Sequence, residues 1–217
     1  MKRVTIVLIL GFLCALQIFA QNGVIKEMSG TVEIKRAGAA AFVAARVGDT
    51  IAKDTIVSTG FKSSALITVG SAVLTVRPLT RLSLAEISAS AGTETINVSL
   101  QTGRVRVDVN PPAGTKSDTS VRGPSATASV RGTSFEFDTH TITVLEGTVA
   151  FQGTTGGPMM VSAGGTSEVT ASGRAADPIT TSAAELMPPP YAGSDTGFQH
   201  GVIIDVRGDF SFRMDLH

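Results

Sequence analysis

Gly132-Thr-Ser-Phe-Glu-Phe137 begins a run of short alternating segments that continues through Ile142-Thr-Val144 and Gly147-Thr-Val-Ala-Phe151. Apolar and polar side chains alternate in each segment, which is the period of two that indicates a half-buried strand. Glycine, aspartate and threonine stand between the segments, as expected for tight turns. This stretch therefore predicts three consecutive short strands, each with one face in a core.

The same pattern extends over most of the chain. Further runs of this kind are Thr31–Ile34, Ala65–Val69, Val73–Val76, Arg81–Leu84, Ile96–Leu100 and Val105–Val109. Five runs begin with a glycine, at a point where a tight turn with positive φ is expected: Gly30, Gly70, Gly103, Gly132 and Gly147. Their intervals are unequal, so there is no fixed repeat. We predict an all-β fold of many short strands, and the pattern leaves a β-roll, an irregular solenoid and a sandwich open.

The length of 217 residues predicts one domain with additional segments. We assign residues 1–20 to a signal peptide, 21–170 to the β domain and 171–217 to a linker and tail. Pro188-Pro-Pro190 is typical of a linker, and Val202–Val206 is one strand candidate that could dock on its own domain or on a partner. Within the domain, Pro111–Thr119 predicts a loop between two blocks of strands.

The N-terminal segment has the order of a secretory signal. Lys2 and Arg3 precede the apolar run Val4–Phe19, and the small residue Ala20 marks a cleavage point. An uncleaved membrane anchor is the alternative, because the run is near the lower limit of a membrane span. We therefore expect an exported protein, periplasmic or extracellular, that meets the membrane through this segment if it is retained. Cys14 is the single cysteine and lies inside the segment, which excludes disulfides and thiolate sites from a mature chain.

Composition and scattered polar residues exclude several classes of function. Lys plus Arg and Asp plus Glu both count 18, so there is no basic excess for a nucleic-acid partner. Aromatic residues make up 5% with no Trp, which supplies few platforms for sugar rings. His140, His200 and His217 stand far apart, which favours neither a metal cluster nor a Ser-His-Asp triad.

The remaining polar motifs are better interpreted as turns than as sites. The carboxylates considered for acid–base work are Asp49, Asp54, Asp138 and Glu146, and no base or orienting group accompanies them in the sequence. The glycine-rich Gly153–Gly157 lacks the lysine of a phosphate loop, and Arg207-Gly-Asp209 is a short chance match to an adhesion tripeptide. We predict no catalytic residue, no metal and no cofactor, and hence a protein that is not an enzyme.

One block carries a family resemblance. Pro124-Ser-Ala-Thr-Ala-Ser-Val-Arg-Gly-Thr-Ser-Phe135 is preceded by Ile56-Val-Ser-Thr-Gly60 and followed by Val144-Leu-Glu-Gly-Thr-Val149. In this order the blocks resemble the FecR family of extracytoplasmic β domains, over about residues 23 to 170. Gly123 stands where that family usually has threonine.

The residues of the central motif are expected to be structural: Pro124, Ala126, Ala128, Val130, Arg131, Gly132, Thr133 and Phe135. The alternating small residues would lie on one closely packed face, and Gly132 would allow a bend into the next strand. Arg131 offers five donors for turn carbonyls or a carboxylate, so Arg131→Ala is expected to lower the melting temperature. In the alternative interpretation Arg131 contacts a partner.

The resemblance implies a role in envelope signalling. Members of the family typically relay the state of an outer-membrane transporter to a sigma factor through a cytoplasmic N-terminal segment. Three residues precede the apolar run in this sequence, so we expect the β module without that regulator. We predict a module that binds an envelope protein partner, through sheet edges or the loops around residues 111 to 123. A glycan- or polymer-binding module, or a purely structural one, is the alternative, and the oligomeric state stays open.

Overall fold

The computed structural model describes residues 22–90 and 92–178. The predicted signal peptide and the tail after residue 178, with Cys14, His200, His217, Val202–Val206 and the Arg207-Gly-Asp209 tripeptide, lie outside these described residues. The elements that the structure describes are strands, β1 to β17, which confirms the all-β prediction. In this part of the chain no helix is long and apolar enough to cross a membrane.

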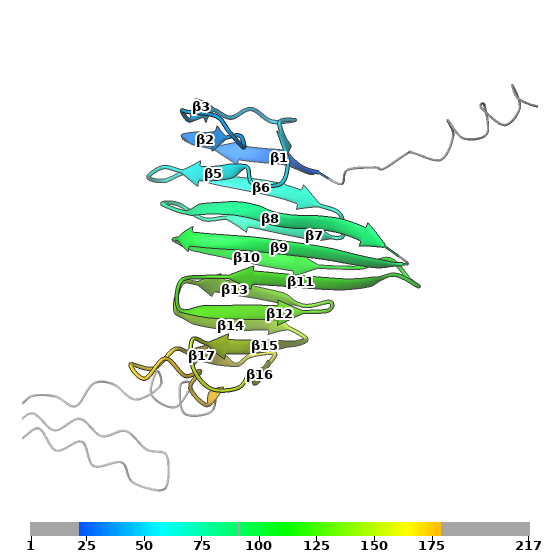
Figure 1. Ribbon diagram of the computed structural model, residues 1–217, viewed down its shortest axis with the longest axis vertical. Helices are drawn as coiled ribbons and strands as arrows, with labels where there is room; N and C mark the ends of the chain where they lie inside the picture. The colour runs from blue at the N-terminus through cyan, green and yellow to red at the C-terminus, as the bar shows by residue number, and fades with distance from the viewer. Residues whose placement is uncertain (1–21, 91, 179–217) are drawn as a thin grey trace, which may run out of the picture. The chain divides into compact units, whose positions relative to one another are not determined.

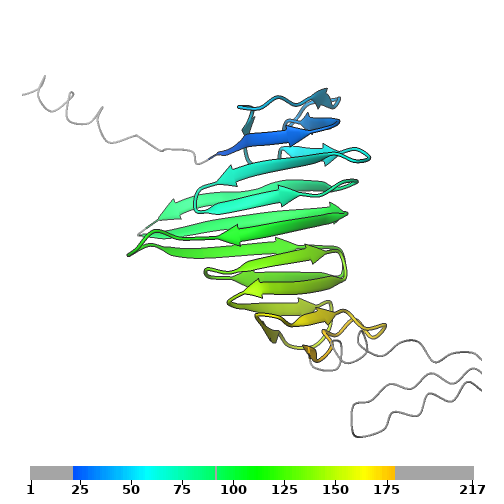
Figure 2. The same cartoon turned by 180° about the vertical axis from the view of Figure 1, so that it is seen from behind.

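The strands form two sheets (Figures 1 and 2). Sheet A contains, in spatial order, β17 (Thr166–Glu168), β14 (Thr141–Glu146), β13 (Ser134–Asp138), β10 (Arg104–Val109), β7 (Ala72–Val76), β6 (Ser64–Val69), β1 (Gly23–Ser29) and β4 (Thr50–Ile51). Sheet B contains β16 (Met159–Ser162), β15 (Thr148–Gly153), β12 (Ala126–Val130), β11 (Lys116–Arg122), β9 (Thr93–Thr102), β8 (Arg81–Ser90), β5 (Ile56–Thr59), β2 (Val32–Lys35) and β3 (Val43–Ala44).

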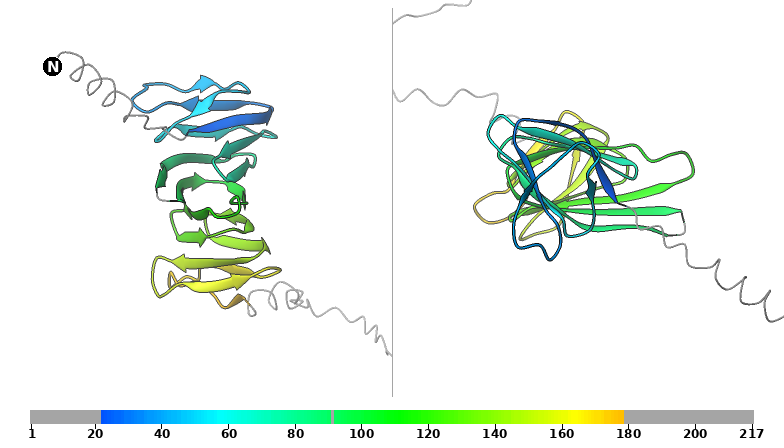
Figure 3. Two further views of the ribbon diagram at one scale, coloured as in Figure 1. Left: turned by 90° about the vertical axis from the view of Figure 1, so that its right-hand side faces the viewer. Right: turned by 90° about the horizontal axis from the view of Figure 1, so that it is seen from above.

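The chain builds the two sheets together, crossing from one to the other as it advances. β6 and β7 lie in sheet A, β8 and β9 in sheet B, β10 in sheet A, and β11 and β12 again in sheet B. Neighbouring strands are antiparallel, except that β9 and β11 are parallel. In cross-section the domain is a sandwich of two sheets, and along its long axis the chain advances as in a solenoid (Figure 3).

The core lies between the sheets and follows from the alternation of the strands. In β6, Ala65, Ile67 and Val69 are buried, while the residues between them are partly exposed. The same pattern recurs in β7, β9, β10 and β12. The aromatic side chains of the core, Phe135, Phe137 and Phe151, lie toward the C-terminal end of the stack. The rings of Phe137 and Phe151 meet edge to face with centroids 6.1 Å apart.

The glycines that begin strands have the conformation expected of them. Each has positive φ, at 72° for Gly30, 53° for Gly70, 86° for Gly103, 136° for Gly132 and 81° for Gly147. Each therefore occupies backbone space that other residues enter at a cost. The prediction of tight turns at these five points is confirmed.

Buried hydroxyl groups tie successive crossovers together. Ser63 Oγ accepts a hydrogen bond from the Thr31 N–H, with N and O 2.8 Å apart. Thr31 follows Gly30, and a Cβ on Gly30 would come within 2.9 Å of Ser63 Cβ. The glycine is thus required twice, for its φ and for the close approach of the next turn.

A second crossover repeats this arrangement. Thr80 Oγ1 accepts from the Arg104 N–H at 2.9 Å, directly after Gly103. The Thr80 N–H in turn donates to Thr59 Oγ1 at 3.0 Å, and Thr59 Oγ1 donates to the Arg77 carbonyl at 2.6 Å. These buried groups form a chain of side-chain and backbone hydrogen bonds along the edge of the stack, and unmet polar groups there would be costly.

The predicted loop Pro111–Thr119 is partly wrong, because β11 already begins at Lys116. The first two inward positions of β11 are Ser117 and Thr119. Both are buried, and their hydroxyl groups lie 3.0 Å apart. Hydroxyl residues at core positions conceal the apolar alternation by which strands are recognised. Similarly, β8 and β9 extend well beyond the predicted Arg81–Leu84 and Ile96–Leu100, since their outer halves are polar.

Backbone hydrogen bonds continue past residue 170, where the sequence predicts the end of the domain. The Thr155 N–H donates to the Gly173 carbonyl at 2.9 Å, and the Ala176 N–H donates to the Glu168 carbonyl at 2.8 Å. Residues 170–176 therefore cover the free edge of β17.

The crossover contacts predict a large difference between two glycines of nearly equal φ. A Cβ on Gly103 would lie 2.5 Å from Thr80 Cα and 2.7 Å from the Leu79 carbonyl oxygen, whereas Gly114, with φ 85°, has open space around it. We expect Gly103→Ala to lower the free energy of unfolding by about 3 kcal/mol and Gly114→Ala by about 1 kcal/mol. Urea unfolding of both variants measures this, and equal losses would contradict the close packing of the crossover.

Candidate functional site

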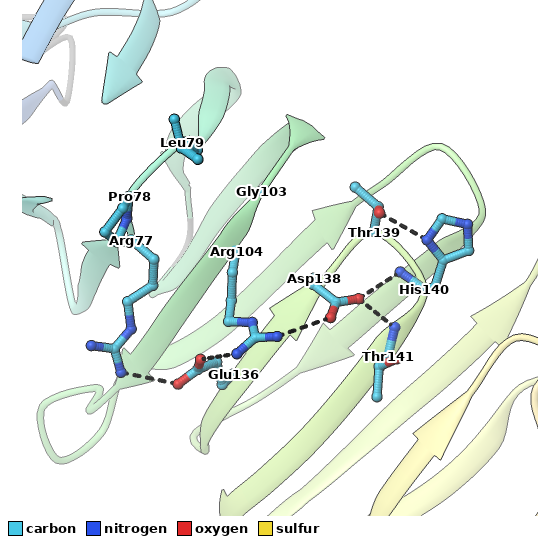
Figure 4. Close-up of a pocket in the computed structure, with 10 residues that line it drawn as sticks. All are labelled: Arg77, Pro78, Leu79, Gly103, Arg104, Glu136, Asp138, Thr139, His140 and Thr141. Atoms are coloured by element: carbon cyan, nitrogen blue, oxygen red, sulfur yellow. Dashed lines mark hydrogen bonds and ion pairs between the residues drawn. The ribbon is translucent and has the colours of Figure 1, made fainter. Parts of the chain in front are cut away.

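A shallow hollow opens on the outer face of sheet A at the ends of β7, β10 and β13 (Figure 4). Its volume is about 790 Å³, and its charged lining comes from Arg77, Arg104, Glu136 and Asp138. Outward positions of β10 and β13 supply three of these residues, because the inward positions hold valine and phenylalanine. The antiparallel register places Arg104 opposite Asp138.

The charged residues form a connected row of ion pairs. Glu136 Oε2 lies 3.1 Å from Arg77 Nη2, and Glu136 Oε1 lies 3.5 Å from Arg104 Nη1. Arg104 Nη2 lies 3.4 Å from Asp138 Oδ2. Since the Arg77 and Arg104 side chains are 43% and 56% exposed, each pair contributes at most about 1 kcal/mol to stability. The row is better suited to meeting a charged or polar partner than to holding the fold.

The hairpin between β13 and β14 closes one side of the hollow. Asp138 Oδ1 accepts from the His140 and Thr141 N–H groups at 2.8 and 2.7 Å. The His140 ring bonds to the neighbouring Thr139 hydroxyl, with Nδ1 and Oγ1 2.8 Å apart. Asp138 therefore caps the turn and does not orient the imidazole, so the three residues do not make a Ser-His-Asp type of arrangement. His140 lies in this hairpin connection.

A second cluster lies beside the hollow on the same face. Arg106 Nε and Nη2 contact Asp108 at 3.0 to 3.2 Å, and the Ser134 hydroxyl also donates to Asp108. Burial acts to raise the pKa of Asp108, but hydrogen bonds from Arg106 and Ser134 outweigh it and hold that pKa below its usual value. The hydrogen bond to Asp108 likewise raises the pKa of Arg106.

Two exposed apolar side chains stand in adjacent turns, and one of them lines the hollow. Phe61, between β5 and β6, is 74% exposed, and Leu79, between β7 and β8, is 62% exposed and lines the hollow. The turns are joined by the Leu79 N–H, which donates to the Gly60 carbonyl at 3.2 Å. Leu79 has φ 55° and Lys62 has φ 52°, so non-glycine residues hold left-handed backbone in both turns.

The central motif predicted from the sequence occupies β12 of sheet B, the crossover to sheet A and the start of β13. Ala126, Ala128 and Val130 face the core from β12, and Phe135 is fully buried in β13. Pro124 is exposed in the turn between β11 and β12. These positions agree with closely packed small residues on one face.

Arg131, Gly132 and Thr133 form the crossover from β12 to β13. Gly132 provides the bend, with φ 136°. Thr133 is buried, and its hydroxyl has no hydrogen-bond partner among the described residues. Arg131 is exposed and takes part in none of the hydrogen bonds or ion pairs found in residues 22–90 and 92–178. The turn carbonyl or carboxylate expected to bind Arg131 is therefore not found there, and nothing in the geometry links Arg131→Ala to a lower melting temperature.

The other polar residues considered from the sequence remain separate. Asp49 accepts from the Arg46 N–H at 2.9 Å, and Asp54 lies in a turn with φ 61°. In the part of the chain that the structure describes, no group of three or more His, Cys, Asp or Glu side chains is placed to hold a metal ion.

No sequence pattern predicted Arg77, Arg104, Glu136, Phe61 or Leu79 as site residues. A signal was present in the charged outward positions of Gly103-Arg-Val-Arg-Val-Asp108 and Phe135-Glu-Phe-Asp138. The pairing of the two strands, which brings those charges together, is set by distant contacts that a single sequence does not reveal.

Comparison with known proteins finds a family match within this stack. The model of the FecR family, described as FecR protein, matches residues 55–150. The chain is similar to the FecR family over these residues. The match runs from the residue before β5 into β15 and contains the motif of residues 124–135, so the resemblance noted in the sequence is confirmed over a shorter range than about 23 to 170.

Solved structures add a distant similarity. Two crystal structures described as "a putative anti-sigma factor" from Parabacteroides distasonis share 16% identity with the chain, with TM-scores of 0.46 and 0.45. They match 60% and 59% of this chain, which spans 64% and 62% of theirs, less than two thirds. No curated protein matches the sequence.

The lowered pKa of Asp108 predicts an acid-dependent loss of stability. Its contribution is present above the unfolded value of about 3.9 and is lost as pH falls through the lower folded value. We expect Asp108→Asn to lower the melting temperature at pH 6. At pH 2 we expect a smaller difference in melting temperature between the variant and the wild type. Thermal unfolding between pH 2 and 6 measures this, with the exposed Asp118→Asn as control. A constant difference across that range would contradict the assignment.

Proposed function

We propose that this protein is a non-enzymatic, exported envelope protein whose FecR-like domain binds a protein partner. The observation that carries the proposal is the pair of exposed apolar side chains, Phe61 and Leu79, on two hydrogen-bonded turns beside the arginines of the hollow. We call this surface, formed by Phe61, Leu79, Arg77 and Arg104, the turn edge.

The composition of the turn edge supports a protein partner. Interfaces concentrate aromatic, aliphatic and arginine side chains at their centres, and a few such residues supply most of the binding energy. Phe61 and Leu79 could enter pockets of a partner, while Arg77 and Arg104 could exchange their half-exposed ion pairs for contacts with it.

The turns that carry the anchors are held before any partner arrives. The buried Thr59 hydroxyl is bonded both to the Arg77 carbonyl and to the Thr80 N–H, so it fixes the two ends of the Leu79 turn. A surface ordered in advance loses less conformational entropy on binding. Leu79 has a left-handed backbone while its side chain remains exposed, and such strain is often found at recognition surfaces.

The regulatory and cellular parts of the proposal rest on the family and on the sequence. A FecR-like domain and an N-terminal segment with the order of a secretory signal support a role in envelope sensing or regulation, in the periplasm or outside the cell. The hollow offers no nucleophile with a base and an orienting group, which supports a binding role over catalysis.

A second candidate function is the binding of a glycan or another envelope polymer. It is favoured by a row of polar side chains across the outer face of sheet B. Asn97 donates to Glu86 at 2.8 Å and accepts from the Ser120 hydroxyl at 2.6 Å. Such a row can offer hydrogen bonds to sugar hydroxyls, although no aromatic platform accompanies it.

The test is a crosslinking capture from envelope extract of the source cells with residues 21–217 as bait. We expect one abundant protein to be retained by the wild type and lost, at least tenfold, by the double variant Phe61→Ser, Leu79→Ser. Met160→Ser is the matched control, since Met160 is 60% exposed on sheet B. Equal retention by the wild type, the double variant and Met160→Ser would exclude the turn edge as the binding surface. Retention of polysaccharide in place of protein would favour the second candidate.

A further inference from the structure

A second hollow lies at the opposite ends of the strands from the turn edge and is independent of the function proposed there. Gly70 and Ser71 precede β7 and Asn110 follows β10, whereas Arg77 and Arg104 mark the other ends of these two strands. The hollow has a volume of about 610 Å³ and is walled on three sides. Two walls are the turns that join β6 to β7 and β10 to β11, and the third consists of Ala89, Ser90, Gly92 and Thr93 at the adjoining ends of β8 and β9 (Figures 1 and 2).

The hollow exists because sheet B extends past sheet A here. β8 and β9 have 10 residues each, while β7 has 5 and β10 has 6. The outer part of the β8–β9 hairpin therefore overhangs the turns of sheet A. Backbone hydrogen bonds fix the walls: the Asn110 N–H donates to the Ser71 carbonyl at 3.0 Å, and the Lys116 N–H donates to the Gly92 carbonyl at 2.9 Å.

Glu94 lies at the base of the hollow and is the charged residue of its lining. It is 5% exposed. Its Oε2 accepts from the Ser71 N–H at 2.9 Å and from the Ser71 hydroxyl. None of the ion pairs found in residues 22–90 and 92–178 involves Glu94.

Glu94 makes the same kind of hydrogen bond as the crossover hydroxyls, but it does so from β9 to the β6–β7 hairpin of sheet A, and its chemistry differs. Ser63 and Thr80 bind the N–H groups that follow Gly30 and Gly103, and Glu94 binds the one that follows Gly70. A serine or threonine does this without bringing a charge. A buried carboxylate without a cation is unfavourable, so the turn itself does not explain why a carboxylate is present.

We propose that this hollow binds a primary ammonium group, with Glu94 as its counter-ion. Oε1 lies against the Gly70 backbone, where a Cβ of Gly70 would be, and it accepts none of the hydrogen bonds found among the described residues, so its lone pairs are unused. Ser90, Thr93 and Thr115 are among the residues that line the same hollow. An ammonium has three donors and a compact charge, which one carboxylate oxygen and other oxygen atoms of the lining can satisfy.

Other cations fit this lining less well. A guanidinium pairs best with both oxygens of a carboxylate, and Ser71 already occupies one of them. Calcium takes six to eight oxygen ligands and usually several carboxylates, whereas the charged lining consists of Glu94. Lys116 is the basic residue nearest in β11, and it alternates with the inward Ser117 and so faces away from Glu94.

The test is an NMR titration of residues 21–217 with Nα-acetyl-lysine amide and with n-butylammonium. We expect both to shift the backbone amide signals of Ser71 and Thr93, with weak affinity, and the Nε-acetylated lysine derivative to leave them unchanged. A response to butylammonium alone would show that the hollow takes free amines and not lysine side chains. A response to Ca²⁺ without one to either amine, or equal responses to the charged and acetylated lysines, would overturn the proposal.

Two variants separate binding from folding. Glu94→Gln keeps an oxygen that can accept from the Ser71 N–H but removes the charge. We expect it to lose the amine response at least tenfold while the melting temperature stays equal or rises. Ala89→Phe, at an exposed lining position opposite Glu94, fills the hollow and should abolish the response with Glu94 intact. An amine response that survives both changes would overturn the assignment, whatever the outcome at the turn edge.

Discussion

The stack depends on one hydrogen bond that recurs where the chain crosses from sheet to sheet. A buried side-chain oxygen of one crossover accepts the backbone N–H that follows the glycine of another. At the crossovers Ser63 binds Thr31 and Thr80 binds Arg104. In the β6–β7 hairpin of sheet A, Glu94 of β9 binds Ser71 in the same way. Such an N–H lies at the end of a strand, where the ladder no longer supplies an acceptor, so a side chain has to provide one.

This bond also sets how closely the crossovers approach, and therefore why glycine precedes it. At Gly30 and Gly103 the neighbouring crossover occupies the space of a Cβ. Thr133 occupies the corresponding place beside Gly147, where its methyl group makes the contact and its hydroxyl stays without a partner in the described part of the chain. The threonine of the family motif thus serves the close packing of a crossover.

These hydrogen bonds account for the rigidity of the two surfaces to which we assign binding. The turn edge stands on the Thr59 and Thr80 bonds, and the ammonium hollow stands on the Glu94 bond at the other ends of the strands. The outer charges of sheet A contribute little to stability because they are half exposed. The buried contacts therefore stabilise the fold, and the exposed side chains at the ends of the strands can serve binding.

Much of the fold could be predicted from the sequence, and much less of the site. Alternation and the strand-initial glycines revealed β2, β6 to β10 and β13 to β15, because period and φ are local properties. They missed β11, where Ser117 and Thr119 take core positions, and they left the architecture open, because the order of strands in a sheet depends on distant pairs. The row of Arg77, Glu136, Arg104 and Asp138 also depends on distant pairs, because the register of β10 and β13 brings its charges together. For Arg131, the motif predicted a bonded structural arginine, and the structure places it exposed on the surface.

Native-state hydrogen exchange tests the role of the crossovers most directly. The amides to follow are those of Thr31 and Arg104 at two crossovers and of Ser71 in the β6–β7 hairpin, with Ala113 in the exposed β10–β11 loop as reference. If the buried side-chain acceptors hold the stack together, the three amides exchange with the free energy of global unfolding, as the central strands do. Exchange of these amides as fast as that of Ala113 would show that the crossovers open independently and would contradict the account.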